Sequence, residues 1–313
     1  MKKSPKIIFY GNPGFAVPTL ALLLQENYPI IAVVTSPDKP AGRGLKIQKT
    51  DVKILAEQHK LEVLQPENLD DKNFIDKLHE LNPDLQVVIA FRKLPAEVWG
   101  TSQLGTINLH PSILPDYRGA APLNWAIING EKETGITTIF INDKIDSGDI
   151  ILQEIVPLSD TDTSGTLHEK LSVMGANLVL KSVEQIITGQ VKIRKQPYDN
   201  TCKKAPKISK EDCRINWNKS STALYNFIRG MSPHPCARTL FGDKIFKIYF
   251  SQAESCFHQF STGTIHTDNR SFLKVATVDG FIHLIEVQLE GKKAMNMVEF
   301  LKGHKINPDS KFT

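Results

Sequence analysis

Asn108 and His110 lie two residues apart in the short apolar segment Thr106-Ile107-Asn108-Leu109-His110. In an extended strand, residues with this spacing point to the same face, so an amide and an imidazole would lie side by side. Pro111 and Pro115 follow, and proline disfavours both a regular strand and a regular helix. We therefore predict a polar pair at the end of a strand, followed by a stiff loop, which is where open α/β sheets bind their ligands.

The first 190 residues alternate between segments typical of strands and of helices. We expect strands at residues 6–10, 30–35, 63–66, 87–90, 106–109, 136–141 and 151–157, and helices at 15–25, 52–59, 72–81, 121–128 and 164–188. This alternation predicts a Rossmann-like α/β fold, a mostly parallel sheet with helices on both faces. The first turn, Gly11-Asn12-Pro13-Gly14, lacks the Gly-x-Gly-x-x-Gly pattern, and Pro13 removes an amide that a pyrophosphate would use. A dinucleotide site is therefore not expected.

The chain changes in character after Gly189. Residues 190–209 are polar and basic and carry two prolines, as linkers do. A helix is then expected at 221–231, followed by segments of strand pattern separated by Gly and Asp turns, at 238–241, 244–250, 263–266, 272–277 and 281–287. Evenly spaced short strands predict a small OB-like β-barrel. We therefore expect a catalytic domain at 1–189, a linker at 190–209 and a C-terminal barrel domain at 210–313.

Positive charge is concentrated toward the C-terminus. Residues 201–313 carry 17 Lys and Arg against 10 Asp and Glu, whereas residues 1–200 carry 21 against 24. A second basic segment, residues 36–49, contains two prolines and two glycines, which predict an irregular loop. It holds the four cations Lys39, Arg43, Lys46 and Lys49. Such segments are either solvated surface or binding sites for a polyanion, and a nucleic acid would suit both of them.

The composition excludes several classes of protein. Hydrophobic residues make up 41% and charged residues 23% of the 313 residues, which suits a folded chain with a sizeable core. No apolar run approaches the ~20 residues that span a bilayer, and the first apolar segment is too short for a signal peptide. We therefore expect a cytoplasmic protein with no membrane partner. The four cysteines form no Cys-x-x-Cys pair, which argues against a zinc or redox motif.

Three motifs together resemble the folate-dependent formyltransferases. They are Asn108-Leu109-His110-Pro111-Ser112-Ile113-Leu114-Pro115, Tyr117-Arg118-Gly119-Ala120-Ala121-Pro122 and Asp146-Ser147-Gly148-Asp149. Within that group, three further motifs are similar to those of the methionyl-tRNA formyltransferases. These are Pro40-Ala41-Gly42-Arg43-Gly44, Ile228-Arg229-Gly230-Met231-Ser232-Pro233 and Gln288-Leu289-Glu290-Gly291-Lys292-Lys293. The likeness covers nearly the whole chain, with the motifs in the family's order.

The resemblance implies roles for particular residues. The family's catalytic Asn, His and Asp match Asn108, His110 and Asp146. Its folate-contacting loop matches Ser112, Ile113, Leu114 and Pro115. Binding of tRNA would involve the basic residues Lys39, Arg43, Lys46, Lys49 and Lys204.

Two segments depart from the family pattern. The first turn reads Gly11-Asn12-Pro13-Gly14-Phe15 where the family usually has Gly-Thr-Pro-Glu-Phe, so a carboxylate is missing near the expected methionyl pocket. Phe91-Arg92-Lys93 stands where many relatives have Tyr-Gly. We do not expect either change to abolish activity.

The activity implied by the resemblance is transfer of the formyl group of 10-formyltetrahydrofolate to the α-amino group of methionyl-initiator tRNA. Attack of the amine on the formyl carbon gives a tetrahedral intermediate that carries an oxyanion. Asn108 and His110 can donate hydrogen bonds to that oxygen, each donor being worth roughly 10²–10³ in rate. Asp146 can orient His110, pair with it and help to relay the proton. The reaction requires no metal, no covalent nucleophile and no protein partner.

Three other interpretations remain open. A formyltransferase for a small amine, such as a glycinamide ribonucleotide or an amino sugar, would need neither basic segment. A catalytically idle RNA-binding relative would not need Asn108, His110 and Asp146 together, and a Rossmann oxidoreductase would need the missing glycine pattern. Taken singly, His110 suits a hydrogen-bonded core histidine and Asp146 a turn residue. The assignment therefore depends on their combination.

Overall fold

The computed structural model of the chain describes residues 4–41, 46–197, 201–307 and 310–313. The chain divides into two compact units. The first comprises Met1–Gly119, Thr134–Val156 and His168–Lys204, and the second comprises Ala120–Glu133, Pro157–Leu167 and Ala205–Thr313. Two short segments that precede residue 168 thus belong with the C-terminal unit.

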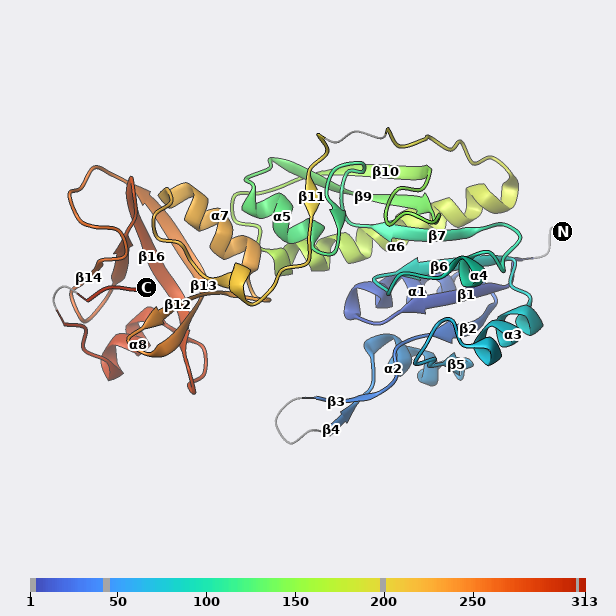
Figure 1. Cartoon of the computed structure of the whole chain (residues 1–313), viewed down its shortest axis with the longest axis horizontal. Coiled ribbons are helices and arrows are strands. Elements are labelled where there is room, and N and C mark those ends of the chain that lie inside the picture. Colours follow the sequence, from blue (N-terminus) through green and yellow to red (C-terminus); the bar gives the residue numbers. More distant parts are fainter. Residues whose placement is uncertain (1–3, 42–45, 198–200, 308–309) are drawn as a thin grey trace. The chain divides into compact units, whose positions relative to one another are not determined.

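The first unit is built around a seven-stranded sheet with the order β10-β9-β7-β6-β1-β2-β5 (Figure 1). The strands are β1 (Ile7–Gly11), β2 (Ile30–Val34), β5 (Val63–Leu64), β6 (Leu85–Ile89), β7 (Thr106–His110), β9 (Glu133–Phe140) and β10 (Ile150–Pro157). Neighbouring strands from β7 to β5 are parallel, and β9 runs antiparallel to β7. The prediction of a mostly parallel sheet is confirmed.

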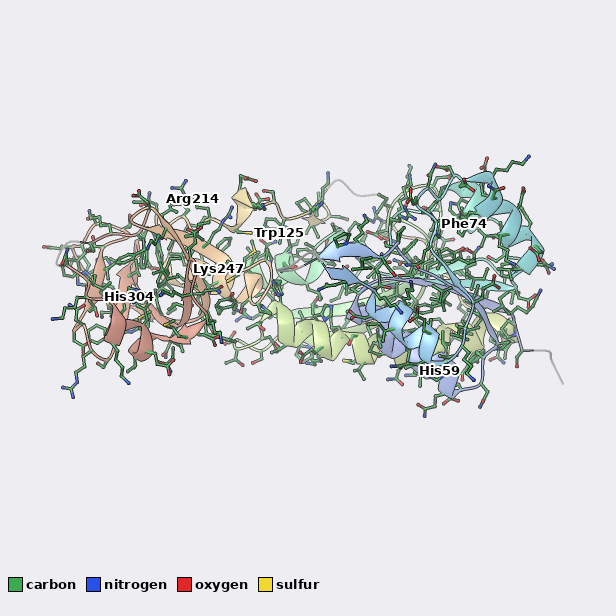
Figure 2. All side chains as sticks on the ribbon, turned by 90° about the horizontal axis from the view of Figure 1, so that it is seen from below. His59, Phe74, Trp125, Arg214, Lys247 and His304 are labelled. Carbon is green, nitrogen blue, oxygen red and sulfur yellow. The ribbon has the colours of Figure 1, made fainter. Side chains whose placement is uncertain are left out.

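Helices pack on both faces of this sheet. They are α1 (Val17–Gln25), α2 (Asp51–Gln58), α3 (Lys72–Leu81), α4 (Ala96–Trp99) and α6 (Ser164–Thr188), with a 3₁₀ turn η1 (Gly14–Ala16) after β1. Tyr10 of β1 belongs to a buried cluster with Phe74 of α3, whose position Figure 2 marks, and Val98 of α4. Thr138 of β9 bonds Ser182 of α6 through their hydroxyl groups, 2.7 Å apart. The sheet is therefore covered by α3 and α4 on one face and by α6 on the other.

Local sequence signals explain where these helices begin and end. Thr50 precedes α2 and accepts a hydrogen bond from the Lys53 amide, and Asp71 precedes α3 and accepts one from the Phe74 amide. Side chains of this kind satisfy amide groups that the first turn of a helix leaves without partners. The helix α3 ends at Leu81 and is followed by Asn82, which has the left-handed backbone that often terminates a helix (φ 46°).

The basic segment at 36–49 is more regular than its prolines suggested. It forms a hairpin of β3 (Lys39–Ala41) and β4 (Lys46–Gln48), in which Lys39 pairs with Gln48 and Pro40 with Ile47. A proline is tolerated there because each strand of a two-stranded ribbon has an outer edge where no backbone N–H has to donate to a neighbouring strand. The expectation of an irregular loop was wrong for these strands.

The second unit contains an antiparallel sheet with the order β12-β13-β16-β15-β14, and β17 pairs with β16. Its elements are β12 (Ala237–Phe241), β13 (Lys244–Ser255), β14 (Ile265–Thr267), β15 (Leu273–Ala276), β16 (Gly280–Leu289), β17 (Met295–Asn296), α5 (Pro122–Ile128), α7 (Ser221–Met231), α8 (Met297–Gly303) and the 3₁₀ turn η2 (Glu211–Cys213). One core that includes Trp217, Phe246 and Phe300 lies inside it. The expected C-terminal domain of antiparallel strands is confirmed. Within the described residues the ladder does not join β12 to β14, so the closed OB-like barrel stays a prediction.

Polar contacts explain why α5 and the segment 157–167 group with this unit. Asn124 of α5 donates to the carbonyl of Gly230 (2.7 Å), and the indole of Trp125, labelled in Figure 2, donates to that of Pro206 (2.9 Å). The guanidinium of Arg229, which is only 6% exposed, donates to the carbonyl of Asp162 (2.8 Å). The motif around Arg229 therefore serves to anchor chain segments within the unit.

Gly175 of α6 provides a test of helix packing behind β7. A Cβ at this position would lie 2.4 Å from Cδ2 of Leu109, which is 2% exposed and has little room to move. We expect Gly175→Ala to lower the free energy of unfolding by about 1–2 kcal/mol through overpacking, in spite of alanine's higher helix propensity. Chemical denaturation measures this change in the free energy of unfolding. The control is Gly303→Ala in α8, where a Cβ would meet no atom within 4 Å. Equal stability of the two variants would contradict the packing argument.

Glu254 of β13 provides a test of pH-dependent stability. Hydrogen bonds from His283 (2.5 Å) and Lys274 (2.9 Å) hold the pKa of its carboxyl at about 2, below the ordinary 4.5. A carboxylate with a lowered folded-state pKa stabilises the fold above its unfolded pKa, and this contribution is lost as the pH falls through the folded value. Glu254→Gln should therefore be less stable than the wild type above about pH 4.5, and the difference should shrink toward pH 2. Denaturation at pH 7, 4 and 2 checks this, and a constant difference would refute it.

Candidate active site

The polar pair of β7 lies on the face of the strand turned away from α6. Leu109 contacts the position of Gly175 on α6, and alternation along the strand therefore points Asn108 and His110 the other way. Asn108 is half-buried, whereas His110 is only 4% exposed. The predicted spacing thus brings an amide and an imidazole to one face at the end of a central strand.

The imidazole of His110 is fixed through one of its nitrogens. Its Nε2 lies 2.9 Å from the backbone carbonyl oxygen of Tyr117. A carbonyl can only accept, so Nε2 is the donor and carries a proton. Tyr117 is itself buried, has a left-handed backbone (φ 61°), and its amide donates to the carbonyl of Lys203 (2.6 Å). This anchor leaves Nδ1 as the ring nitrogen available for chemistry.

Asp146 faces that second nitrogen. Its Oδ1 lies 3.6 Å from Nδ1 of His110, and its side chain is 13% exposed. The other carboxylate oxygen, Oδ2, accepts a hydrogen bond from the amide of Gly119 (3.0 Å). The structure therefore brings His110 and Asp146 together, although 35 residues separate them in the sequence, as their numbering shows.

The turn that carries Asp146 is tightly specified. Asn142 accepts hydrogen bonds from the Lys144 amide and the Ser147 hydroxyl, both at 3.0 Å. At Gly148 a Cβ would lie 1.6 Å from the carbonyl oxygen of Phe140, so any other residue would displace the turn. Asp146 has a left-handed backbone (φ 53°), which is strained for a residue other than glycine. The Asp-Ser-Gly-Asp motif thus holds one carboxylate in a position that the backbone would not adopt freely.

The expected folate loop divides into anchoring and accessible residues. Ser112 is buried and its hydroxyl donates to the carbonyl of Asp116 (2.6 Å). Leu114 is 2% exposed, packs with Ile139 and Ile150, and its carbonyl accepts from Gln153 (3.0 Å). Two of the four residues therefore hold the loop in place.

The remaining two loop residues, Ile113 and Pro115, are half-buried. A hollow of about 310 Å³ borders the site, lined by Arg118, Asn142, Asp143, Lys144, Ser147, Gln196 and Pro197. Neither His110 nor Asp146 lines it. Ile113 and Pro115 are the loop residues with exposed surface for a ligand.

The basic residues expected to bind tRNA differ in their surroundings. Lys39 and Lys204 are exposed, whereas the ammonium of Lys49 bonds Glu57 of α2 at 2.6 Å. Lys46 begins β4, and Arg43 lies outside the described residues. Lys39 and Lys204 are thus better placed than Lys49 to meet a polyanion.

The two departures from the family pattern have local explanations. The side-chain oxygen of Asn12 accepts hydrogen bonds from the Ser36 amide (2.8 Å) and the Thr35 hydroxyl (3.0 Å), which ties the end of β1 to the end of β2. A Cβ on Gly14 would lie 3.5 Å from a carboxylate oxygen of Asp51, so that carboxylate stands beside the position where the family usually has glutamate. Arg92 donates to the carbonyls of Pro66 and Glu67.

Three further observations on the described residues concern metal ligands, thiols and membrane helices. The described residues contain no group of three His, Cys, Asp or Glu arranged to hold a metal. Cys202, Cys213, Cys236 and Cys256 are unpaired, and burial raises the pKa of the Cys236 thiol to about 12. Among the described residues, no helix is both long and apolar enough to cross a bilayer.

Sequence reasoning missed three contributors to the site. The Tyr117 carbonyl and the Gly119 amide act through the backbone, and a backbone group leaves no side-chain signal. Gln196, whose amide donates to the carbonyls of Asp146 (3.0 Å) and Gly148 (2.7 Å), lies in a segment that only looks like a linker. Its position could be found only from the folded chain.

Comparison with known proteins places the chain in a family. Residues 5–183 match the formyl transferase family model, and residues 207–305 match the model of the formyl transferase C-terminal domain. The methionyl-tRNA formyltransferase of Bacteroides fragilis is 46% identical over 310 residues, 96% of each chain. That of Flavobacterium johnsoniae is 43% identical over 310 residues, 98% of each chain.

A solved structure has a similar fold at lower sequence identity. The N-formyltransferase of Helicobacter canadensis, crystallised with folinic acid and dTDP-3-aminofucose, superposes with a TM-score of 0.62 at 23% identity, covering 89% of this chain and 98% of that one. At this identity the likeness concerns the fold alone. The two family models and the near full-length relatives decide the question: the chain belongs to the methionyl-tRNA formyltransferase family.

Proposed function

We propose that this enzyme transfers the formyl group of 10-formyltetrahydrofolate to the α-amino group of methionyl-initiator tRNA. The observation that carries the proposal is the placement of the Asp146 carboxylate 3.6 Å from Nδ1 of His110, at the end of the strand that also presents Asn108. Relatives that are 43–47% identical over nearly the whole chain carry the name of this activity.

The chemistry follows from what these groups can donate and accept. The amine nitrogen attacks the formyl carbon, the new C–N bond forms, and the carbonyl electrons move to oxygen. Collapse of this intermediate re-forms the carbonyl and breaks the bond to N10 of the folate. The amine loses one proton and N10 gains one, so the site has to stabilise an oxyanion and move a proton.

We assign these two tasks to different residues. The amide of Asn108 donates to the oxyanion and cannot ionise, so it remains a donor throughout. His110 presents its second ring nitrogen, Nδ1, to the substrate beside Asp146. Asp146 receives or relays the proton of the attacking amine. Nδ1 and Oδ1 lie 3.6 Å apart, somewhat farther than in an ordinary hydrogen bond, so both atoms can be reached by the same substrate amine.

The assignment of the loop and the basic residues is part of the same proposal. Ser112, Ile113, Leu114 and Pro115 form the wall of the folate site, with Ser112 and Leu114 supporting Ile113 and Pro115 from behind. Lys39, Arg43, Lys46, Lys49 and Lys204 would contact the phosphates of the tRNA. Cations on a projecting hairpin suit a backbone rich in phosphate.

Three expectations accompany this function. We propose that the enzyme acts in the cytoplasm, where charged initiator tRNA is formylated, and that it needs neither a membrane nor a protein partner. The chain is expected to divide into a catalytic domain (1–189), a linker (190–209) and a tRNA-binding domain (210–313).

A small amine is the competing acceptor. The fold is shared with N-formyltransferases crystallised with dTDP or with dTDP-3-aminofucose, but only at 21–23% identity. A small-amine enzyme would have no use for the basic hairpin. Assays with charged initiator tRNA, charged elongator tRNA and free amino sugars distinguish the two, because only the proposed function gives preferential transfer to the initiator.

Asp146→Asn tests the proton role. The amide keeps the size of the carboxylate and can still accept from Gly119, but it cannot take up a proton. We expect kcat to fall by about 10²–10⁴ with little change in melting temperature. Asp143→Asn is the control, because Asp143 is an exposed carboxylate in the same turn. Near-normal turnover of Asp146→Asn would remove Asp146 from the mechanism.

Lys39→Ala and Lys49→Ala test the hairpin as a phosphate-binding element. Lys39 is exposed, whereas Lys49 bonds Glu57, so the first substitution should matter more. We expect Lys39→Ala to raise KM for tRNA and to make the plot of log(kcat/KM) against log salt shallower by about one unit. KM for the folate should not change. If folate KM rose instead, the hairpin would belong to the folate pocket.

A further inference from the structure

Gln196 connects two loops of the active site through a single amide. Its Oε1 accepts two hydrogen bonds from the Arg118 guanidinium, from Nε (3.1 Å) and Nη2 (2.6 Å). Its Nε2 donates to the carbonyl of Asp146 (3.0 Å) and to that of Gly148 (2.7 Å). The side chain therefore has both donors and both acceptor positions in use.

These bonds close a ring around Asp146. The carbonyl of Asp146 accepts from Gln196, and its carboxylate accepts from the amide of Gly119, which follows Arg118 in the chain. Arg118 in turn donates to Gln196. The backbone end and the side-chain end of Asp146 are thus held from the same short segment, directly or through Gln196.

The hydrogen bonds of this ring can maintain the strained backbone of Asp146. A left-handed backbone at a residue other than glycine costs free energy, and it persists only where the surroundings determine it. With φ at 53°, the turn would gain by relaxing if its carbonyl were released. Relaxation would move the carboxylate away from Nδ1 of His110, which lies 3.6 Å from it.

We propose that Gln196 is a positioning residue, which holds the turn of Asp146 so that its carboxylate faces His110. The inference rests on the proposed function, because it assigns Gln196 to the formyl-transfer step. Gln196 acts on the reaction only through Asp146. No hydrogen bond between Gln196 and Asn108 or His110 exists in the described structure.

The segment that carries Gln196 has other attachments. On its N-terminal side, the backbone of Arg194 exchanges hydrogen bonds with that of Ile150 (2.8 and 2.9 Å). On its C-terminal side, the amide of Lys203 donates to the carboxylate of Asp116 (2.9 Å). Replacing Gln196 should therefore leave the segment in place and affect the turn locally.

Two substitutions separate the bonds that Gln196 makes. Gln196→Met has a similar size and makes none of them, whereas Gln196→Glu can still accept from Arg118 but cannot donate to the two carbonyls. We expect both variants of the full-length enzyme to lower kcat by about 10- to 100-fold, as a misplaced catalytic group does. KM for charged initiator tRNA and for 10-formyltetrahydrofolate should stay within about three-fold. Full activity of Gln196→Glu would overturn the proposal, because the donors would then be dispensable.

Arg194→Ala is the matched control. Arg194 lies two residues before Gln196 and also bonds a glutamine, Gln153, through its guanidinium (2.8 Å). Among the described residues it forms no hydrogen bond or ion pair with Asp146. We expect wild-type kcat for this variant. A loss as large as that of Gln196→Met would mean that any disturbance of the segment lowers activity, which would overturn the specific role of Gln196.

A double-mutant cycle distinguishes positioning from general support of the fold. Once Asp146→Asn has removed the carboxylate, its placement no longer matters, so adding Gln196→Met should lower kcat by less than about two-fold. Independent effects would multiply instead, and that result would overturn the proposal. Wild-type transfer to charged initiator tRNA is measured first. Its absence would count against the proposed function, and the cycle would then be run with whichever amine accepts the formyl group.

Discussion

The pairing of Nδ1 of His110 with the carboxylate of Asp146 is the interaction on which the site depends. His110 lies at the end of β7, whereas Asp146 lies in the turn after β9. That strand runs antiparallel to β7, and Phe140 at its end pairs with Ile107 near the start of β7. His110 lies three residues further along, roughly 10 Å at 3.3 Å per residue. The turn after β9 therefore has to return along the sheet before Asp146 can reach the imidazole. This reversal explains why the turn is so tightly constrained.

Backbone groups provide much of that constraint. The Tyr117 carbonyl fixes Nε2 of His110 and the Gly119 amide fixes the carboxylate of Asp146, so one short segment orients both side chains. Tyr117 and Asp146 both have left-handed backbones, a conformation that is retained where surrounding contacts determine it. The strained backbones of Tyr117 and Asp146 therefore help to hold the two side chains in place, because relaxing either residue would separate His110 from Asp146.

The sequence allowed prediction of what depends on local pattern. The spacing of Asn108 and His110 follows from the two-residue period of a strand, and the alternation of strands and helices was enough for the parallel sheet. Contacts between residues that are distant in the sequence could not be predicted from local pattern. The approach of Asp146 could be expected only from the family resemblance, and Gln196 stands in a segment whose composition suggests a linker. The hairpin of β3 and β4 was not predicted, because prolines usually disfavour strands. The grouping of α5 with the C-terminal unit depends on contacts between distant segments, such as that of Trp125 with Pro206.

The hydrogen bond from Nε2 of His110 to the Tyr117 carbonyl affects which groups of the site can donate to the formyl oxygen. Two donors to the formyl oxygen were expected, but a ring nitrogen that already donates to a carbonyl has no second proton to give. Only Nδ1 can turn toward the substrate, and it shares its surroundings with Asp146. Under the proposed function, Asn108 is then the donor whose role is independent of proton transfer, whereas His110 and Asp146 act as one unit. Removal of Asn108 and removal of Asp146 should accordingly impair different parts of the same step.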